Sequence, residues 1–413
     1  MFDRWYASAL AAKLSRPYVH ILFGARQTGK STLANALLPA ECLHIDFADP
    51  SERSLHLSRP GEFIAICRAL PSGKKPHFVF VDEVQAVPSV FDSVQSLYDS
   101  DKSRWRFVLC GSSARKLRRT GANLLPGRSF LHRLFPLVLG EHPSRSSLSS
   151  PGQAVVPLDW RGGLPEHPFP AWNLEERLAY GALPGIVAAG QSDRPELLKA
   201  FAAVHLEEEI RREALVRDWG AFVRFLQFAA IASGHALNFA AISQEIGVSL
   251  PTIRSYYQLI EDMFIGFRVP AYTKSRRKSL LCTPRFLLFD LGVRHAAAGL
   301  LPSIEIVRAN PGPLFEQWVG IELWKRLQYL GDGQLFYQRT RDGAEIDFVV
   351  ERGNVLIPVE VKWTENPTLH DARHILSFIA ENAPVAPRGY VVCRCRRPLE
   401  LHEKVTALPW HML

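Results

Sequence analysis

Apolar residues in the first 141 positions gather in short runs that alternate with amphipathic stretches. Runs that are apolar at nearly every position are typical of strands covered on both faces, since a strand with one wet face alternates instead. Helix-like stretches such as KSTLANALL and SVFDSVQSLYDS separate the runs. This alternation predicts an α/β domain with a parallel sheet. The predicted strands are YVHILFG, CLHIDF, HFVFVDE, RFVLCGS and HRLFPLVLGE.

Composition and hydrophobic periodicity change several times along the rest of the chain. Residues 142–173 are rich in Pro, Ser and Gly and lose periodicity, which predicts a linker or surface insertion. Residues 174–263 have apolar positions at helical spacing, and residues 264–290 return to strand-like runs. Helices mixed with a hairpin follow. We therefore expect four parts, which are residues 1–141, 142–173, 174–300 and 301–413.

The composition is that of a globular chain. Of 413 residues, 47% are hydrophobic and 22% are charged, and no apolar run reaches the roughly 18 residues of a membrane-spanning helix. The six cysteines show no C-x-x-C spacing, which argues against a disulfide framework or a zinc ribbon. The first residues lack the apolar core of a secretion signal. We expect a cytoplasmic protein with no membrane partner.

Positive charge is clustered along the chain, although the formal net charge is only +8. A cluster of cations lowers the free energy of a nearby polyanion, so DNA is a candidate partner. A solvated surface is the alternative for any single cluster. The clusters are Arg115, Lys116, Arg118, Arg119, Arg128 and Arg133, then Arg211, Arg212 and Arg217, and finally Lys274, Arg276, Arg277 and Lys278.

A phosphate-binding motif follows the first predicted strand and opens a predicted helix. Residues 24–31 fit G-x-x-x-x-G-K-[ST] at every fixed position. The glycines let backbone N–H groups wrap the phosphates of ATP, and the helix N-terminus favours their charge. We expect Lys30 to reach the β- and γ-phosphates, and Ser31, with Thr32 as the alternative, to hold Mg²⁺. The predicted ATP-binding residues are Gly24, Ala25, Arg26, Gln27, Thr28, Gly29, Lys30, Ser31 and Thr32.

Further catalytic candidates stand at or near the later predicted strands. Asp82 is expected to hold Mg²⁺ through water and Glu83 to polarise the attacking water, so the pair predicts hydrolysis. Ser113 is a candidate for sensing the γ-phosphate or placing the water, with a capped strand end as the alternative. Arg128, and after it Arg133, are candidates for an arginine that acts on a neighbouring subunit's nucleotide. A nucleic-acid contact is the alternative role for Arg128.

Several of these segments resemble one prokaryotic family of AAA+ ATPases whose C-terminal half is a domain of unknown function. The segments GARQTGKST, VFVDEVQ, CGSSA and LPGRSFLHRLFPLVLGE resemble its AAA+ module. Later segments, YGALPGIV, RFLLFDLGV, LFEQWVGIEL and GAEIDFVV with VEVKW, also match, so the resemblance covers nearly the whole chain. The insertion at 142–172 looks longer than the family pattern requires. We expect an AAA+-type ATPase that uses ATP and Mg²⁺ and works as a homo-oligomeric ring, with a hexamer as one option.

The middle of the chain carries a helix-turn-helix pattern. A short helix is expected to end at Gly247, and Ser249 can cap a second helix that has Pro251 in its first turn. The strand-like runs MFIGFRVPAY and LLCTPRFLLFD flank a basic tip and look like a wing. The alternative is a helix-turn-helix that only packs within an AAA+ lid. Candidate DNA contacts are Thr252, Arg254, Ser255, Lys274, Arg276, Arg277 and Lys278.

The last part of the chain holds a nuclease-like set of residues. Asp347 lies on a predicted strand, and Glu360 and Lys362 are two apart on the next, so both point to one face. Two carboxylates beside a lysine can hold Mg²⁺ and orient a water toward a phosphodiester, and Glu316 on a predicted helix could complete the metal site. The order resembles the PD-(D/E)xK nuclease core. Pro358 is awkward in a central strand, and an inactive nuclease-like fold is the alternative.

The expected fold is α/β, with a P-loop NTPase sheet domain, a helical and winged-helix middle domain, and an α/β nuclease-like C-terminal domain. One predicted function is an ATP-hydrolysing AAA+ protein that binds DNA and processes or remodels it, with nuclease activity left open. The other is a nucleotide-switched DNA-binding or signalling ATPase whose terminal domain is catalytically inactive. Lys362, present beside Asp347 and Glu360, favours the first.

Overall fold

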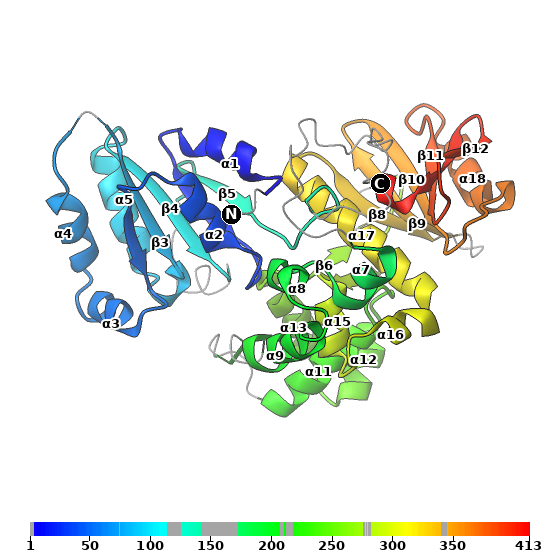
Figure 1. Ribbon diagram of the computed structural model, residues 1–413, viewed down its shortest axis with the longest axis horizontal. Helices are drawn as coiled ribbons and strands as arrows, with labels where there is room; N and C mark the ends of the chain where they lie inside the picture. The colour runs from blue at the N-terminus through cyan, green and yellow to red at the C-terminus, as the bar shows by residue number, and fades with distance from the viewer. Residues whose placement is uncertain are drawn as a thin grey trace. The chain divides into compact units, whose positions relative to one another are not determined.

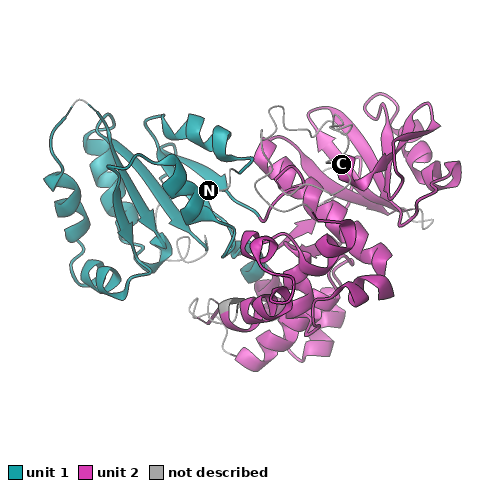
Figure 2. Ribbon diagram, viewed as in Figure 1, with its two compact units in different colours: residues 1–135, 258–265 teal, residues 136–257, 266–413 magenta. Residues whose placement is uncertain are grey.

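The computed structural model divides the chain into two compact units (Figure 2). The first unit contains residues 1–135 and 258–265, and the second contains residues 136–257 and 266–413. Figure 1 labels the helices and strands in chain order. The structure describes residues 4–73, 75–113, 125–141, 172–206, 210–211, 218–275, 277, 279, 282–339 and 345–413.

A five-stranded parallel sheet lies at the centre of the first unit (Figure 1). The strand order is β2-β3-β4-β1-β5, and every neighbouring pair is parallel. All five residues of β1 are buried, which explains its uninterrupted apolar run. The predicted α/β domain with a parallel sheet, of the kind found in P-loop NTPases, is confirmed. The strands are β1 (Val19–Phe23), β2 (Leu43–Asp46), β3 (His77–Asp82), β4 (Trp105–Gly111) and β5 (Ser129–Arg133).

Helices connect these strands and build the core of the first unit. Phe63 of α4 and Phe91 and Leu97 of α5 pack with Val79 and Phe107 of the sheet. The prediction of a strand over 132–141 is wrong in position, because β5 ends at Arg133 and Pro136 has no N–H for a ladder. The helices are α1 (Ala7–Leu14), α2 (Lys30–Leu37), α3 (Pro50–Ser58), α4 (Glu62–Ala69), η1 (Val84–Ala86) and α5 (Val90–Ser100).

Two buried histidines face each other on neighbouring strands of this sheet. His20 Nδ1 of β1 lies 3.1 Å from His132 Nε2 of β5, and the Tyr6 hydroxyl lies 2.9 Å from His132 Nδ1. Burial lowers the pKa of His20 to about 4 and that of His132 to about 3. The two rings are therefore neutral at physiological pH.

The middle of the chain is mainly helical, as its periodicity predicts. Gly247 ends α12 at φ 78°, and the Thr252 N–H donates to Ser249 Oγ over 3.3 Å at the start of α13. Strands β6 (Gly266–Val269) and β7 (Arg285–Leu288) pair antiparallel, and Ala236 bridges to Arg285. The helices are α7 (Leu174–Tyr180), α8 (Pro184–Ala188), α9 (Arg194–Ala200), the π-helix η3 (Phe201–Leu206), α11 (Trp219–Ile231), α12 (Phe239–Ile246), α13 (Leu250–Asp262), α15 (Leu291–Ala297) and α16 (Ile304–Ala309).

A six-stranded mixed sheet, in the order β12-β13-β11-β10-β9-β8, forms the C-terminal part of the second unit (Figure 1). The predicted hairpin is present as antiparallel β9 and β10, with Gly353 at φ 59° in the turn. Ile375 and Phe378 of α18 pack on Val391 of this sheet. The elements are α17 (Pro311–Leu330), β8 (Gln334–Arg339), β9 (Glu345–Arg352), β10 (Val355–Val361), η4 (Leu369–Ala372), α18 (Arg373–Glu381), β11 (Gly389–Cys393), β12 (Leu399–His402), β13 (Val405–Pro409) and η5 (Trp410–Met412).

The segment that follows β5 is bound to α17 inside the second unit. Lys325 Nζ donates to the Leu137 carbonyl over 2.6 Å, and the Leu139 N–H donates to Glu322 Oε1 over 2.8 Å. Arg326 Nε also donates to Glu322 Oε1, over 2.9 Å. All three charged side chains are buried, and the two nearby cations help lower the pKa of Glu322 to about 2 despite its burial.

The described part of the chain contains no helix that is both long and apolar enough to cross a membrane.

Candidate functional site

The loop between β1 and α2 has the backbone geometry that its glycines predict. A Cβ at Gly24 would lie 2.2 Å from the Leu134 carbonyl oxygen, so only glycine fits there. Gly29 takes φ 87° just before Lys30 begins α2. Lys30 Nζ donates to the carbonyls of Gly24 and Ala25 over 2.9 and 2.8 Å. The ammonium group therefore lies within the loop whose phosphate ligand it is predicted to contact.

Arg4, which no sequence motif indicated, donates hydrogen bonds to this loop and to the end of the first unit. Its Nη1 donates to the Thr28 carbonyl over 2.6 Å, and its Nη2 donates to the Phe135 carbonyl over 2.7 Å. The side chain is buried. One guanidinium group thus joins the phosphate-binding loop to the chain that leaves β5. Residues 4 and 135 are too far apart in sequence for any local pattern to show this.

The predicted acidic pair lies at the end of β3. Asp82 Oδ1 accepts from the Glu83 N–H over 2.9 Å, and Glu83 takes φ 50°, which is unusual for a residue with a side chain. Gln85 Nε2 donates to the Glu83 carboxylate and, over 2.9 Å, to Ser112 Oγ just after β4. Gln85 therefore links Glu83 to the strand end that carries the predicted Ser113, which is also buried.

Strands β1, β3 and β4 are parallel, so the phosphate-binding loop and the acidic pair follow them at one edge of the sheet. The thiol of Cys110 on β4, opposite Leu22, lies near the same edge. Burial raises its pKa well above the ordinary value, and the negative charge of Asp82 raises it further, whereas Lys30 acts in the opposite direction. Electrostatic effects of this kind need short separations inside a protein. The topology of the sheet thus brings Lys30, Asp82 and Glu83 to the same edge.

The two candidate arginines lie at opposite ends of β5. Arg128 precedes the strand, and its Nε donates to Asp99 Oδ1 over 2.7 Å. Its carbonyl accepts from Val19 at the beginning of β1, away from the phosphate-binding loop. Arg133 ends β5 opposite Phe23, the last residue before that loop. Within one chain Arg133 is closer to the nucleotide site, and an arginine that acts on a neighbouring subunit stays a prediction.

A second polar site lies on the C-terminal sheet, in a pocket of about 290 Å³. Three of the four predicted nuclease-like residues meet there, namely Asp347 of β9, Glu360 of β10, and Lys362 just after it. Glu316 of α17 does not line the pocket, and Arg285 Nη1 donates to its Oε1 over 2.8 Å. Sequence reasoning missed the wall from η4 and α18. The lining residues are Glu345, Asp347, Glu360, Lys362, His370, Asp371, Arg373 and His374.

The hydrogen bonds in this pocket leave one carboxylate oxygen unused. Asp347 Oδ2 accepts from the Val361 N–H over 2.8 Å, and Lys362 Nζ donates to Glu360 Oε1 over 2.7 Å. Glu360 is 4% exposed, and its Oε2 has no hydrogen-bond partner among the described residues. A buried oxygen of this kind is costly unless a proton, a water or a cation satisfies it.

Burial in this part of the domain destabilises the ionised form of the carboxyl groups relative to the protonated form. Burial, and next the charge of Asp347, raise the pKa of Glu360 to about 7 and that of Glu316 to about 7. Burial also raises the pKa of Asp347. A divalent cation would relieve this cost. The described residues contain no group of three or more ligating side chains placed to hold a metal, but Mg²⁺ often takes only one or two carboxylates and completes its shell with water and substrate oxygens.

The predicted DNA contacts are partly accessible. Arg254 and Ser255 of α13 are exposed, whereas Thr252 is half-buried. Lys274 and Arg277 are exposed between β6 and β7, and Lys274 Nζ donates to the Glu381 carbonyl over 3.3 Å. Residues outside the described part of the chain include Arg276, Lys278, Arg115, Lys116, Arg118, Arg119, Arg212 and Arg217.

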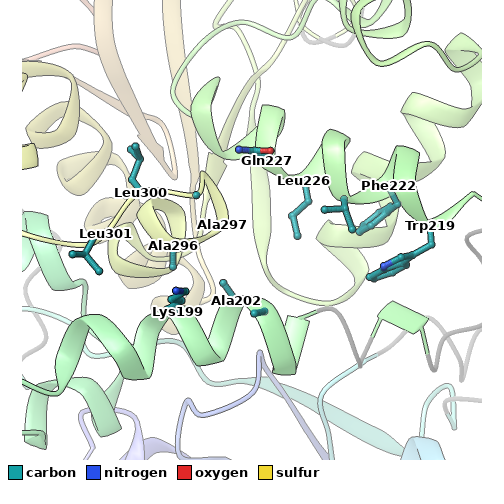
Figure 3. Close-up of a pocket in the computed structure, with 13 residues that line it drawn as sticks. Lys199, Ala202, Trp219, Phe222, Leu226, Gln227, Ala296, Ala297, Leu300 and Leu301 are labelled. Atoms are coloured by element: carbon teal, nitrogen blue, oxygen red, sulfur yellow. The ribbon is translucent and has the colours of Figure 1, made fainter.

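An apolar pocket of about 350 Å³ lies among α9, η3, α11 and the segment after α15 (Figure 3). Trp219 and Phe222 of α11 line one side, and Leu300 and Leu301 line another (Figure 3). Among the residues that the structure describes, Lys199 is the one charged side chain in the lining. The described lining residues are otherwise apolar or uncharged.

Comparison with known proteins supports the assignment of the first unit. Residues 16–142 match the AAA domain family, which indicates an ATPase. Residues 311–413 match a domain of unknown function (DUF4143), and residues 171–303 match another (DUF8612). These matches confirm the predicted AAA-type module and the C-terminal domain of unknown function.

Two uncharacterized bacterial proteins are similar to most of this chain at low identity. "Uncharacterized protein Rv2008c" of Mycobacterium tuberculosis is 24% identical over 365 residues, which cover 88% of this chain and 74% of that protein. An "uncharacterized protein" of Haemophilus influenzae is 22% identical over 376 residues, covering 87% and 86%. The crystal structure of protein VC1899 from Vibrio cholerae aligns at 13% identity over 93% of this chain and 90% of that one, but its TM-score of 0.18 is too low to indicate a shared fold.

Proposed function

We propose that this protein is an ATP-hydrolysing, DNA-binding protein that processes phosphodiesters in its C-terminal pocket with the help of Mg²⁺. The proposed phosphodiester chemistry rests on one observation, which is the buried Oε2 of Glu360, without a hydrogen-bond partner among the described residues, beside Asp347 and Lys362. Such an oxygen has no role in packing, and the raised pKa values of the carboxylates favour a bound cation.

ATP hydrolysis rests on the residues at the ends of β1 and β3. Lys30 holds the β- and γ-phosphates, and Ser31 at the start of α2 and Asp82 at the end of β3 would hold Mg²⁺. Glu83 orients the attacking water and takes a proton from it. Gln85 fixes the carboxylate of Glu83 by its hydrogen bond. The proposed assembly is a homo-oligomeric ring, which supplies an arginine to each nucleotide from the next subunit.

In the C-terminal pocket, Asp347 and Glu360 would hold the ion, which supplies Lewis-acid stabilisation of the scissile phosphate when bound. Lys362 lies on the same side and already donates to Glu360. Once Glu360 binds the ion, the ammonium group of Lys362 is available to orient a water or to stabilise charge on the phosphate. Glu316 supports the site at a distance through Arg285, which also donates to the Asp347 carbonyl over 3.4 Å.

DNA binding rests on the order of elements from α11 to β7. A helix, a short extended segment at 235–237, two helices and an antiparallel strand pair follow one another, which is the order of a winged helix. Arg254 and Ser255 are exposed near the start of α13, where a recognition helix enters a groove. The wing segment pairs with β8 through Ala271 and Tyr337, which fixes its base while Lys274 and Arg277 stay exposed.

The proposal is tested with the full-length chain and two matched variants. Glu360→Gln removes the carboxylate charge from the pocket, and Glu400→Gln makes the same change at an exposed position on β12. We expect wild type and Glu400→Gln to bind Mn²⁺ in a calorimetric titration and to cut linear, forked or junction DNA. Glu360→Gln is expected to lose both properties. Equal Mn²⁺ binding by all three proteins would overturn the metal site.

A second function is favoured by the ion pair between Lys362 and Glu360, which holds the lysine away from any substrate. In that case the protein is a nucleotide-switched DNA-binding ATPase whose pocket is catalytically inactive. DNA binding that depends on ATP, together with no cleavage of any DNA form in Mg²⁺ or Mn²⁺, would support this function over the first.

A further inference from the structure

The pocket that holds Asp347 and Glu360 has a basic wall on the side of η4 and α18. Arg373 Nη1 lies 2.6 Å from His370 Nε2, and Arg373 Nε donates to His374 Nε2 over 2.9 Å. Because a guanidinium group has donors only, both ring nitrogens must accept. The two imidazoles are therefore neutral here, and they hold the plane of Arg373 from two sides.

The positive charge of Arg373 is not used by a carboxylate. Asp371, two residues earlier in the chain, is the nearest carboxylate in sequence. Its Oδ2 instead accepts from the N–H and the hydroxyl of Thr368, over 2.8 and 3.1 Å. Within the described part of the chain, Arg373 makes no ion pair. Its side chain is exposed at the rim of the pocket. An arginine fixed by two neutral rings and left without an anion is prepared for a ligand of opposite charge.

The charge balance of the pocket makes anion binding depend on a cation. Glu345 is paired with Arg285, so among the described lining residues Asp347, Glu360 and Asp371 face Lys362 and Arg373. When all three are ionised, these carboxylates outnumber the two cations by one, and this excess repels an anion from the pocket. A divalent ion between Asp347 and Glu360 reverses the balance and leaves Arg373 to attract the anion.

We propose that Arg373, held by His370 and His374, is a phosphate-binding subsite that contacts a nucleic-acid strand once a divalent cation occupies the carboxylates. The inference rests on the proposed function and adds the group that takes the substrate's phosphate. A guanidinium group offers two parallel N–H donors to phosphate oxygens, a geometry that a lysine cannot reproduce. The phosphate can be an internal phosphodiester or a terminal phosphate, and the experiment separates the two.

The test measures how much a divalent cation strengthens DNA binding by the full-length chain. Fluorescence anisotropy compares labelled oligonucleotides with a 5′-phosphate or a 5′-hydroxyl, in EDTA and in Ca²⁺. We expect Ca²⁺ to raise the DNA affinity of the wild type. In Arg373→Ala, the factor by which Ca²⁺ raises the affinity should be about tenfold smaller, which is the size of one charge-assisted contact. Arg373→Lys should keep part of the gain. Arg388→Ala removes an exposed arginine just before β11, outside the pocket lining, and should keep all of it.

A separate Mn²⁺ titration distinguishes the failure of this inference from the failure of the proposed function. If wild type and Arg373→Ala both bind Mn²⁺ and show the same gain in DNA affinity, the subsite is refuted and the metal site stands. If wild type binds no Mn²⁺, the metal site itself is refuted and the subsite with it. A gain seen only with 5′-phosphorylated DNA assigns the subsite to a terminal phosphate, and an equal gain assigns it to an internal phosphodiester.

Discussion

Replacing Arg4 with alanine is expected to lower both the stability of the first unit and its affinity for nucleotide. The guanidinium group makes two short hydrogen bonds, to the carbonyls of Thr28 and Phe135, and it is buried. A hydrogen bond to a charged group contributes about 1.5–3 kcal/mol, and Arg4 makes two of them. The alanine variant therefore loses roughly 3 kcal/mol or more of unfolding free energy.

The same change should also affect nucleotide binding, because Thr28 lies inside the phosphate-binding loop. Loss of the Arg4 bond would let the loop leave the geometry that is expected to direct its N–H groups toward the phosphates. We expect nucleotide affinity to fall by about tenfold, which corresponds to 1.4 kcal/mol. The measurements are chemical denaturation of the nucleotide-free protein and titration with a fluorescent ATP analogue.

A matched control separates this effect from a general loss of positive charge. Arg16→Ala removes the same charge from the same N-terminal segment, but Arg16 is exposed. Arg4→Lys keeps the charge and loses the fork, so it should fall between wild type and Arg4→Ala. If Arg4→Ala matches Arg16→Ala in both stability and affinity, the positioning role assigned to Arg4 is wrong.

Three further predictions concern catalysis, DNA and pH. Lys30→Ala should abolish nucleotide binding, whereas Glu83→Gln should bind ATP and hydrolyse it far more slowly; a wild-type rate for Glu83→Gln would contradict its role. Protonation of His20 and His132 is disfavoured only in the folded state, so stability should fall as pH drops below about 6.5, by roughly 2 kcal/mol per ring at pH 5. Denaturation at pH 7.5 and 5 checks this, and equal stabilities would contradict it. Alanine at the four wing cations should lower the salt dependence of DNA binding by a slope of ~0.9 per lost contact and leave the ATPase activity without DNA unchanged. An unchanged slope would place the DNA surface elsewhere. The four cations are Lys274, Arg276, Arg277 and Lys278.

Local chemistry explains what the sequence could predict. The phosphate-binding loop can be predicted from the sequence because Gly24 and Gly29 occupy backbone positions where a side chain is excluded or strained. The β9–β10 hairpin is readable because alternating strands flank a turn with Gly353 at positive φ. These features depend on residues within a few positions of one another.

Contacts between distant segments explain what the sequence could not predict. Arg4 meets Phe135 across 131 positions, and no periodicity marks either residue. Glu316 fits the nuclease-like order, yet Arg285, 31 positions earlier, binds its carboxylate. His370 and Arg373 stand on an ordinary amphipathic segment, and only the packing of α18 on the sheet brings them to Asp347.

The attachment of the chain after β5 to α17 has a mechanical consequence. Phe135, whose carbonyl Arg4 holds, is only two residues from Leu137, whose carbonyl accepts from Lys325 of α17. That helix has 20 residues and spans about 30 Å, and Glu316 stands on it less than two turns from Glu322. A stiff helix transmits force along its axis. Only Pro136 separates the two carbonyls that Arg4 and Lys325 hold, so the covalent link between the first unit and this helix is as short as one residue.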